Sequence, residues 1–183
     1  MALSLLYVRA HGLVRTGAMR SLAAIFARER PDVAAVCEVD SGDALSLATR
    51  FALHWAYRGR QALFWNGGFT AREVHGRYLP FNPARPFDRR GLVRVDAVRS
   101  GRTCMLATTQ FAQVRESRIP ELRYMRAALR GATHDAIVFA QLDERHVAFG
   151  DLGFREPDAN ADDERIYVRG FQDDLLRATF ARV

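Results

Sequence analysis

Residues 30–40 read Arg30-Pro31-Asp32-Val33-Ala34-Ala35-Val36-Cys37-Glu38-Val39-Asp40, and this stretch decides the fold predicted for the chain. Pro31 and Asp32 end the preceding helix. The small and apolar residues that follow are too few for a helix and rich enough in valine for a central strand. Open α/β folds usually place ligands at the carboxyl edge of the sheet, so Glu38 is the first candidate site residue. The alternative is a strand-end glutamate that faces solvent, since a carboxylate marks a site only in favourable surroundings.

Length and composition indicate one globular unit. The chain has 183 residues, 49% of them hydrophobic, so a single domain over residues 1–183 is expected. No apolar run approaches the roughly 20 residues of a membrane span, and the run from Leu3 to Val8 is too short for a signal peptide. A cytoplasmic protein is therefore expected. Cys37 and Cys104 lie in apolar, strand-like runs without metal-ligand spacing, which predicts buried free thiols.

The formal charge of +6 favours an anionic partner, because phosphates are attracted to basic proteins. However, the chain contains no lysine, so all 27 basic residues are arginine, and these are spread along the sequence with few aromatic residues between them. A selected nucleic-acid surface would gather basic and aromatic residues together. The charge is therefore weak support for an anionic ligand.

Hydrophobic periodicity predicts alternating strands and helices in the first third of the chain. Strands are expected at Leu3–Arg9, at the opening stretch and from Phe51 to Tyr57. A helix begins at Thr16 or Gly17, and a second helix is capped by Ser41.

From Gln61 onward, strand follows strand. The remaining elements are expected at 61–65, 70–79, 91–98, 102–111, 135–141, 164–168 and 175–183, with one helix at 116–129 that carries Pro120 in its first turn. Ser100-Gly101 forms the turn of a hairpin. This order predicts two packed sheets with helices outside.

The order of the short motifs resembles the endonuclease/exonuclease/phosphatase superfamily, the DNase I-like proteins, over nearly the whole chain. Pro31-Asp32 with Cys37-Glu38-Val39 is similar to the family's strand with the metal-binding glutamate. The hairpin that leads to Thr108-Thr109-Gln110 is similar to the one that ends in Thr-His. Further similar segments are Gln61-Ala62-Leu63, 135–144, 152–155, 164–168 and Gln172-Asp173-Asp174-Leu175. The resemblance implies a four-layer α/β/β/α sandwich of two mostly antiparallel or mixed sheets.

The resemblance also implies a chemistry. Family members hydrolyse phosphoesters with a divalent metal held by carboxylates, a histidine that takes a proton from water, and polar groups that steady the phosphoryl oxygens. At the corresponding places this chain has Glu38 and Asp173 as implied metal ligands, and Arg9, Gln110, Gln141, Asp143 and Asp174 as the other site residues.

Four of these places depart from the family pattern. Arg9 replaces an asparagine, Gln110 a histidine, Gln141 an aspartate and Asp174 the final histidine. Glutamine cannot accept a proton at neutral pH, and an aspartate with an ordinary pKa near ~3.9 is a feeble base. None of the five histidines falls at a family catalytic place; His146 is expected in a solvent-facing loop after Asp143.

These departures suggest a specific contact. Arg9 and Glu38 end neighbouring strands, and an unpaired charge in a cleft is costly, so Arg9 is expected to pair with Glu38 in the place that magnesium fills in active relatives. The alternatives are an Arg9 turned to solvent, and a hard cation held by oxygen ligands. The acids available for such a cation are Glu38, Asp143, Glu164, Asp173 and Asp174.

Three functions follow. The first is a divergent family member, a pseudoenzyme whose phosphoester hydrolysis is lost or remodelled. Such a protein would need no cofactor. It would keep a cleft for a phosphorylated ligand, a nucleic acid or a protein partner. The second is an active phosphodiesterase or nuclease that uses Mg²⁺ or Mn²⁺ with Asp143 and Asp174 as its acid and base. The third is a protein-interaction module that uses exposed aromatic residues, with the candidates Phe69, Tyr78, Phe81 and Phe87.

Overall fold

The computed structural model describes residues 2–10, 16–80, 90–112, 115–130, 135–141, 152, 154–155, 164–171 and 176–182. In chain order its elements are β1 (Leu3–Arg9), α1 (Thr16–Glu29), β2 (Val33–Cys37), α2 (Ser41–Phe51), β3 (His54–Arg58), β4 (Gln61–Trp65), β5 (Thr70–Tyr78), β6 (Gly91–Arg99), β7 (Arg102–Gln110), α3 (Arg115–Arg130), β8 (Asp135–Gln141), β9 (Glu164–Arg169) and β10 (Leu176–Arg182). Each lies within a few residues of its predicted position.

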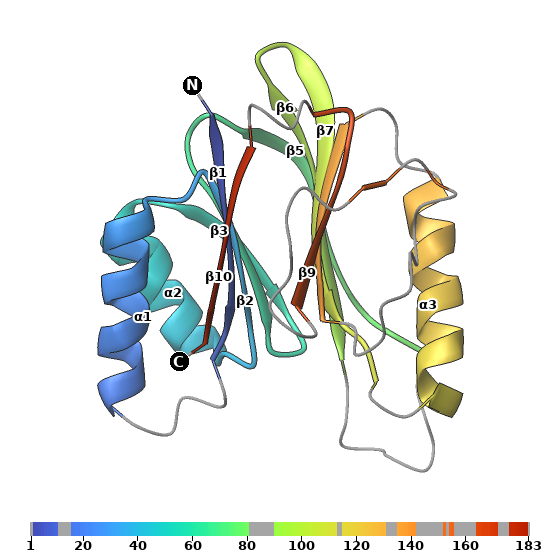
Figure 1. The fold of residues 1–183 in the computed structure, drawn as a ribbon, viewed down its shortest axis with the longest axis horizontal. Coiled ribbons are helices and arrows are strands. Elements are labelled where there is room, and N and C mark those ends of the chain that lie inside the picture. The colour runs from blue at the N-terminus through green and yellow to red at the C-terminus, as the bar shows by residue number, and fades with distance from the viewer. Residues whose placement is uncertain are drawn as a thin grey trace.

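Two five-stranded sheets form the centre of the fold. One has the order β10-β1-β2-β4-β3 and the other the order β5-β6-β7-β8-β9. Strand β1 is parallel to both its neighbours, and β7 is parallel to β8, while the other pairs are antiparallel. Helices α1 and α2 lie against the outer face of the first sheet and α3 against the outer face of the second (Figure 1). The predicted four-layer α/β/β/α sandwich of mixed sheets is confirmed.

Apolar residues occupy both faces of the central strands, because each sheet is covered on both sides. In β1, Leu5 and Tyr7 face the other sheet, whereas Leu6 and Val8 face the helices. The layer between the sheets is closed by contacts such as the edge-on packing of Tyr7 on Phe139, with ring centroids 5.8 Å apart. This is why a strand that alternates one residue per face has a continuous apolar sequence.

Both cysteines are buried free thiols, as predicted. Burial, followed by the negative charge of Asp135, raises the pKa of Cys104 to about 11. Among the helices in the described part of the chain, none is both long and apolar enough to cross a membrane.

Two predictions about α2 were wrong at its ends. Phe51 ends the helix instead of opening the next strand, because its ring packs against Phe26 of α1 at 5.7 Å between centroids. Ala52 then ends the helix in the left-handed conformation with φ +51°. At the other end, Asp40 is the N-cap and Ser41 the first helical residue; no side-chain hydrogen bond is made by Asp40 at this cap.

Pro120 also differs from the prediction. Helix α3 begins at residue 115, so Pro120 lies in its second turn and not in the first. Proline has no N–H to donate to the carbonyl group of residue 116, so α3 lacks one of its backbone hydrogen bonds at this point. The proline side chain is exposed, on a face of the helix that the sheet does not cover.

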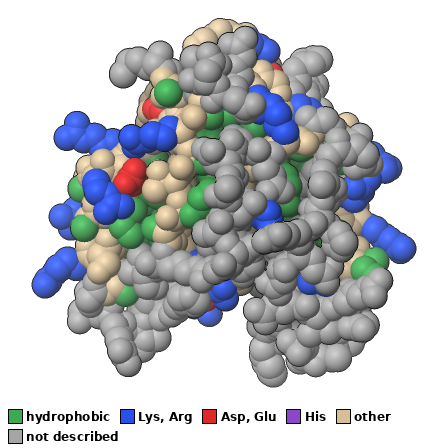
Figure 2. Space-filling model, in the orientation of Figure 1, with side chains coloured by type: hydrophobic (Ala, Val, Ile, Leu, Met, Phe, Trp, Pro, Cys, Tyr) green, Lys and Arg blue, Asp and Glu red, His purple; other side chains and the backbone are tan. Residues whose placement is uncertain are grey.

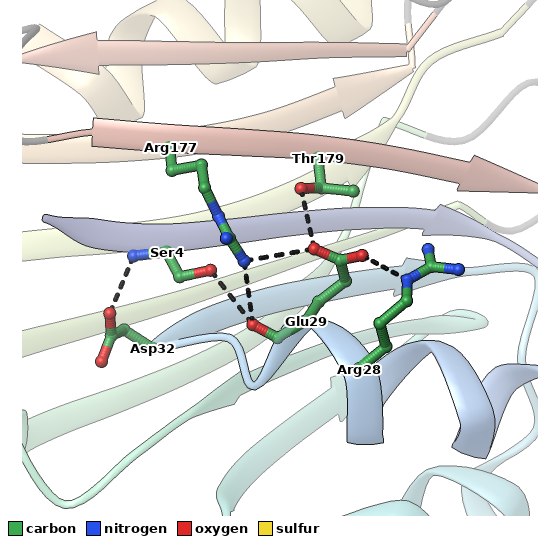
Figure 3. Close-up of polar contacts among 6 residues, drawn as sticks. All are labelled: Ser4, Arg28, Glu29, Asp32, Arg177 and Thr179. Atoms are coloured by element: carbon green, nitrogen blue, oxygen red, sulfur yellow. Dashed lines mark hydrogen bonds and ion pairs between the residues drawn. The ribbon is translucent and has the colours of Figure 1, made fainter.

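A polar cluster connects the edge strand β10 to the end of α1 (Figure 3). Glu29 Oε1 accepts a hydrogen bond from Arg28 Nε at 2.6 Å. Its Oε2 accepts from Arg177 Nη2 at 3.2 Å and from Thr179 Oγ1 at 3.3 Å, both on β10. Nearby, Ser4 N of β1 donates to Asp32 Oδ2 at 2.7 Å, so the start of β1 is connected to the start of β2.

The stability contributed by Glu29 is expected to disappear in acid. The hydrogen bond from Arg28, together with the charges of Arg28 and Arg177, lowers the pKa of Glu29 below its ordinary 4.5 despite the opposing effect of burial. A lowered pKa in the folded state means that the contribution is complete above the unfolded value and is lost as the pH falls through the folded one. Thermal melting between about pH 6 and pH 3 should therefore show a steeper loss for the wild type than for Glu29→Gln.

The difference should stay below about 1 kcal/mol, because the two arginine partners are 69% and 59% exposed and the pairs are screened by solvent. Parallel melting curves for the two proteins over that range would contradict a role for Glu29 in docking β10.

Candidate functional site

Five strands have a polar residue at or just beyond the end that lies at one edge of the sandwich. Arg9 is the last residue of β1, Glu38 follows β2, and Gln61 opens β4; Gln110 and Gln141 are the last residues of β7 and β8. In the first sheet, Cys37 is paired with both Arg9 and Gln61. In the second, Gln110 is paired with Gln141. We call these five residues the strand-end site.

A chain of hydrogen bonds crosses this site from one sheet to the other. Glu38 Oε1 is 3.2 Å from Arg9 Nε, and the same oxygen accepts a hydrogen bond from Gln110 Nε2 at 3.0 Å. Gln61 Nε2 in turn donates to Gln110 Oε1 at 3.1 Å. The predicted contact between Arg9 and Glu38 is therefore present. Their side chains are only 16% and 21% exposed, so solvent screens the pair less than it would at the surface.

The backbone at Glu38 has an uncommon conformation. Its φ of +62° lies in the left-handed region, which costs a residue with a Cβ about 1 kcal/mol. Neighbouring contacts hold it there: Ala10 N donates to Cys37 O at 3.0 Å, Val39 N donates to Arg60 O at 3.4 Å, and Arg60 Nη2 donates to Glu38 O at 3.4 Å. The end of β2 is thus fixed by residues from β1 and from the turn between β3 and β4.

The described residues of this site do not fit a divalent metal ion. Magnesium and manganese prefer several oxygen ligands around the ion. Here Glu38 Oε1 accepts from a guanidinium and an amide N–H, so the groups around that oxygen are donors, and one of them is itself a cation. Two positive charges on one half-buried carboxylate oxygen would repel each other.

One group of described residues could supply three metal ligands, and it lies elsewhere. Ligand atoms of Glu73, His75 and Asp96 are within 4.8 Å of one another. Glu73 and His75 belong to β5, and Asp96 belongs to β6. The neighbouring Arg94 of β6 donates a hydrogen bond to the Ala128 carbonyl oxygen of α3. This group therefore lies on the outer face of the second sheet, the face that α3 covers. Glu38, by contrast, contacts Gln110 at the edge where the ends of the two sheets meet.

The other predicted site residues are placed only in part. Gln141 is buried, 3% exposed, and its strand position is opposite Glu164. The positions Asp143, Asp173 and Asp174, and with them His146, lie outside the described residues. The prediction that Glu38 and Asp173 bind a metal together is therefore not tested.

Gln61 is the site residue that the sequence did not single out as functional. It is completely buried at the start of β4, and its Oε1 has no hydrogen-bond partner among the described residues. The only local sign is a polar residue at the head of an apolar strand. Of the aromatic residues suggested for an interaction surface, Phe69 is buried, 2% exposed, so that expectation was wrong; Tyr78 is 42% exposed. Phe81 and Phe87 lie outside the described residues.

On the face drawn in Figure 2, the described arginine side chains lie at several places, both along the outline and within the face. Several are occupied in packing: Arg58 lies 4.4 Å over the ring of Tyr78, and Arg99 lies 5.4 Å over that of Phe69. Such contacts use the arginine side chain as apolar cover as well as a charge. This use of arginine agrees with the interpretation of the net charge as only weak support for an anionic ligand.

Comparison with known proteins gives structural likeness without sequence likeness. No protein-family model matches the chain, and a search of curated proteins gave no match. Among solved structures, the mannosyl-6-phosphatase Bt3783 of Bacteroides thetaiotaomicron has a TM-score of 0.71 at 13% identity, over 92% of this chain and 85% of that one.

Two further structures have similar values. An endonuclease/exonuclease/phosphatase protein of Bacteroides vulgatus has a TM-score of 0.72 at 11% identity, over 90% of this chain and 85% of that one. D. rerio TDP2 in complex with a single-strand DNA product has a TM-score of 0.67 at 16% identity, over 91% and 83%. At such identities the likeness establishes the fold, which is the DNase I-like one that the motif order suggested.

Proposed function

We propose that the chain is a divergent member of the endonuclease/exonuclease/phosphatase family, in which metal-dependent phosphoester hydrolysis is lost or remodelled and the strand-end site binds a ligand or partner. The observation that carries this proposal is the occupation of Glu38 Oε1 by Arg9 Nε and Gln110 Nε2. The guanidinium supplies a fixed positive charge beside the one described carboxylate of the site. A metal ion would have to displace it.

The loss of proton-handling groups supports the same conclusion. Hydrolysis of a phosphoester by water needs a group that accepts a proton, and losing a positioned general base typically reduces the rate by ~10² to 10⁴. Gln110 and Gln141 cannot titrate, and Gln110 is already bonded on both sides of its amide, to Glu38 and to Gln61.

The ligand we propose for this site is a phosphorylated molecule or a nucleic acid; a protein partner is the second possibility. The support is analogy: one structural neighbour is a mannosyl-6-phosphatase and another is in complex with a single-strand DNA product.

The test is hydrolysis of bis(p-nitrophenyl) phosphate and of a single-stranded oligonucleotide in the presence of Mg²⁺ or Mn²⁺. We expect no turnover above the buffer rate for the wild type, and the same for Glu38→Ala, which serves as the control for contaminating nucleases. Turnover by the wild type that Glu38→Ala abolishes would overturn the proposal. It would favour an active metal-dependent phosphodiesterase that uses Asp143 and Asp174.

A further inference from the structure

A second site is present on the other face of the second sheet. A cavity of about 320 Å³ lies between the β5–β6 hairpin and α3, which is within the size range of small-molecule sites. The polar part of its wall consists of His75, Arg77, Arg94 and Tyr124, and the rest of Leu92, Ala127 and Ala128.

The sheet register places these side chains together. His75 and Arg77 are two residues apart in β5 and so point to the same face. Their partners in β6 are Arg94 and Leu92. From α3, Tyr124 and Ala128 are one helical turn apart and cover the same patch. Two strands and a helix thus contribute to one wall.

Carboxylates outside the cavity wall hold two of its polar groups in position. Asp96 accepts hydrogen bonds from Arg94 Nε at 3.0 Å and Nη2 at 2.9 Å, a two-bond contact that fixes the plane of the guanidinium. Arg94 Nη1 reaches the Ala128 carbonyl oxygen at 3.4 Å. His75 Nε2 is 3.0 Å from Glu73 Oε2, so this nitrogen carries a proton toward the carboxylate.

The side chains that line the cavity include no carboxylate. Arg77 is exposed and lines the cavity, and it makes no ion pair with any residue in the described ranges. Glu73 and Asp96 weaken the positive field, but the first is 68% exposed and screened by solvent, and the second is turned to Arg94. A wall of donors beside an apolar patch suits a molecule with an anionic group and a small apolar body.

We propose that this cavity binds a small organic oxyanion, a phosphate or carboxylate attached to a short aliphatic or aromatic group. Its anionic oxygens contact Arg77 and Arg94, and its apolar body lies on Leu92 and Ala128. The site is separate from Glu38 and does not depend on the function proposed for the strand-end site.

The proposal is tested by amide NMR titration of the full chain with phenyl phosphate, benzoate, inorganic phosphate and benzyl alcohol. Saturable shifts are expected in β5, β6 and α3 with phenyl phosphate or benzoate, with a dissociation constant of about 1 mM. Benzyl alcohol, which lacks the charge, and inorganic phosphate, which lacks the apolar body, should bind at least about tenfold more weakly. The tighter of the first two identifies the preferred anionic group.

Variants distinguish binding in this cavity from binding elsewhere on the protein. Arg77→Gln should weaken binding about tenfold or more, since a charge-assisted hydrogen bond is lost. Arg72→Gln, an exposed arginine of the same strand outside the cavity wall, should bind like the wild type. Equal melting temperatures for the Arg77 and Arg72 variants would show that both are folded.

Two results would overturn the proposal. They are no saturable shift in β5, β6 and α3 below about 10 mM of either organic anion, and wild-type affinity in Arg77→Gln.

Discussion

Gly91→Ala is expected to lower the free energy of unfolding by about 3 kcal/mol or more, and the melting temperature by about 6–12 °C. Gly91 opens β6 at the point where the turn between β3 and β4 touches it. A Cβ added there would meet the backbone carbonyl oxygen of Arg58, and it would lie 3.0 Å from Gly59 N. Because both neighbours are backbone atoms, no side-chain rotation can relieve the overlap, and the two sheets would have to separate locally.

Gly42→Ala is the matched control. Apart from its chain neighbours and the backbone of its own helix, no atom of the described residues lies within 4 Å of the Cβ that this change adds, and Gly42 is the second residue of α2. Alanine is the better helix former, so stability should be unchanged or raised by less than about 1 kcal/mol. Chemical denaturation of the two variants beside the wild type measures the difference. Equal stabilities of Gly91→Ala and Gly42→Ala would mean that β6 does not approach the β3–β4 turn this closely.

Arg9→Asn is expected to change metal binding at the strand-end site by about tenfold or more. In the wild type, Arg9 Nε lies 3.2 Å from Glu38 Oε1, so a divalent ion at that oxygen would face a fixed positive charge. Asparagine removes this charge and offers an amide oxygen, the kind of ligand that hard cations accept. Calorimetry with Mn²⁺ should give a dissociation constant below about 1 mM for the variant and above about 10 mM for the wild type.

Arg60→Asn provides the control for a general effect of removing positive charge. Arg60 is exposed and contacts Glu38 through the backbone carbonyl oxygen, not through the carboxylate. We expect this variant to bind Mn²⁺ as weakly as the wild type does. If the wild type and Arg9→Asn bound Mn²⁺ equally well, Arg9 would not occupy the place of a cation. The contact between Arg9 and Glu38 would then no longer support the proposal that hydrolysis is lost or remodelled.

The contact between Arg9 and Glu38 could be anticipated because Arg9 is the last residue of β1 and Glu38 follows the last residue of β2. Parallel neighbours finish at the same edge of a sheet, so residues that follow β1 and β2 meet there. The role of Gln61 could not be anticipated in this way. Gln61 begins an antiparallel strand, and only the pairing of that strand with β2 brings its first residue beside the last residues of the parallel ones.

The errors at Phe51 and Pro120 have different origins. An apolar aromatic residue near a helix end is equally suitable for a strand, and the packing of Phe51 on Phe26 decides in favour of the helix. Pro120 is the sixth residue of α3, and even a helix that began at residue 116 would have had it fifth, past the first turn.

The sequence by itself determined the order of strands and helices and the layers they form. The reason is that burial of one or both faces of a helix or strand requires a periodic pattern of apolar residues in its sequence. Only the tertiary structure decided which polar side chains meet: Gln61 and Gln110 are 49 residues apart, and Gln110 and Glu38 are 72 apart. Contacts over such separations depend on strand register and on the packing of one sheet on the other, which no local pattern records.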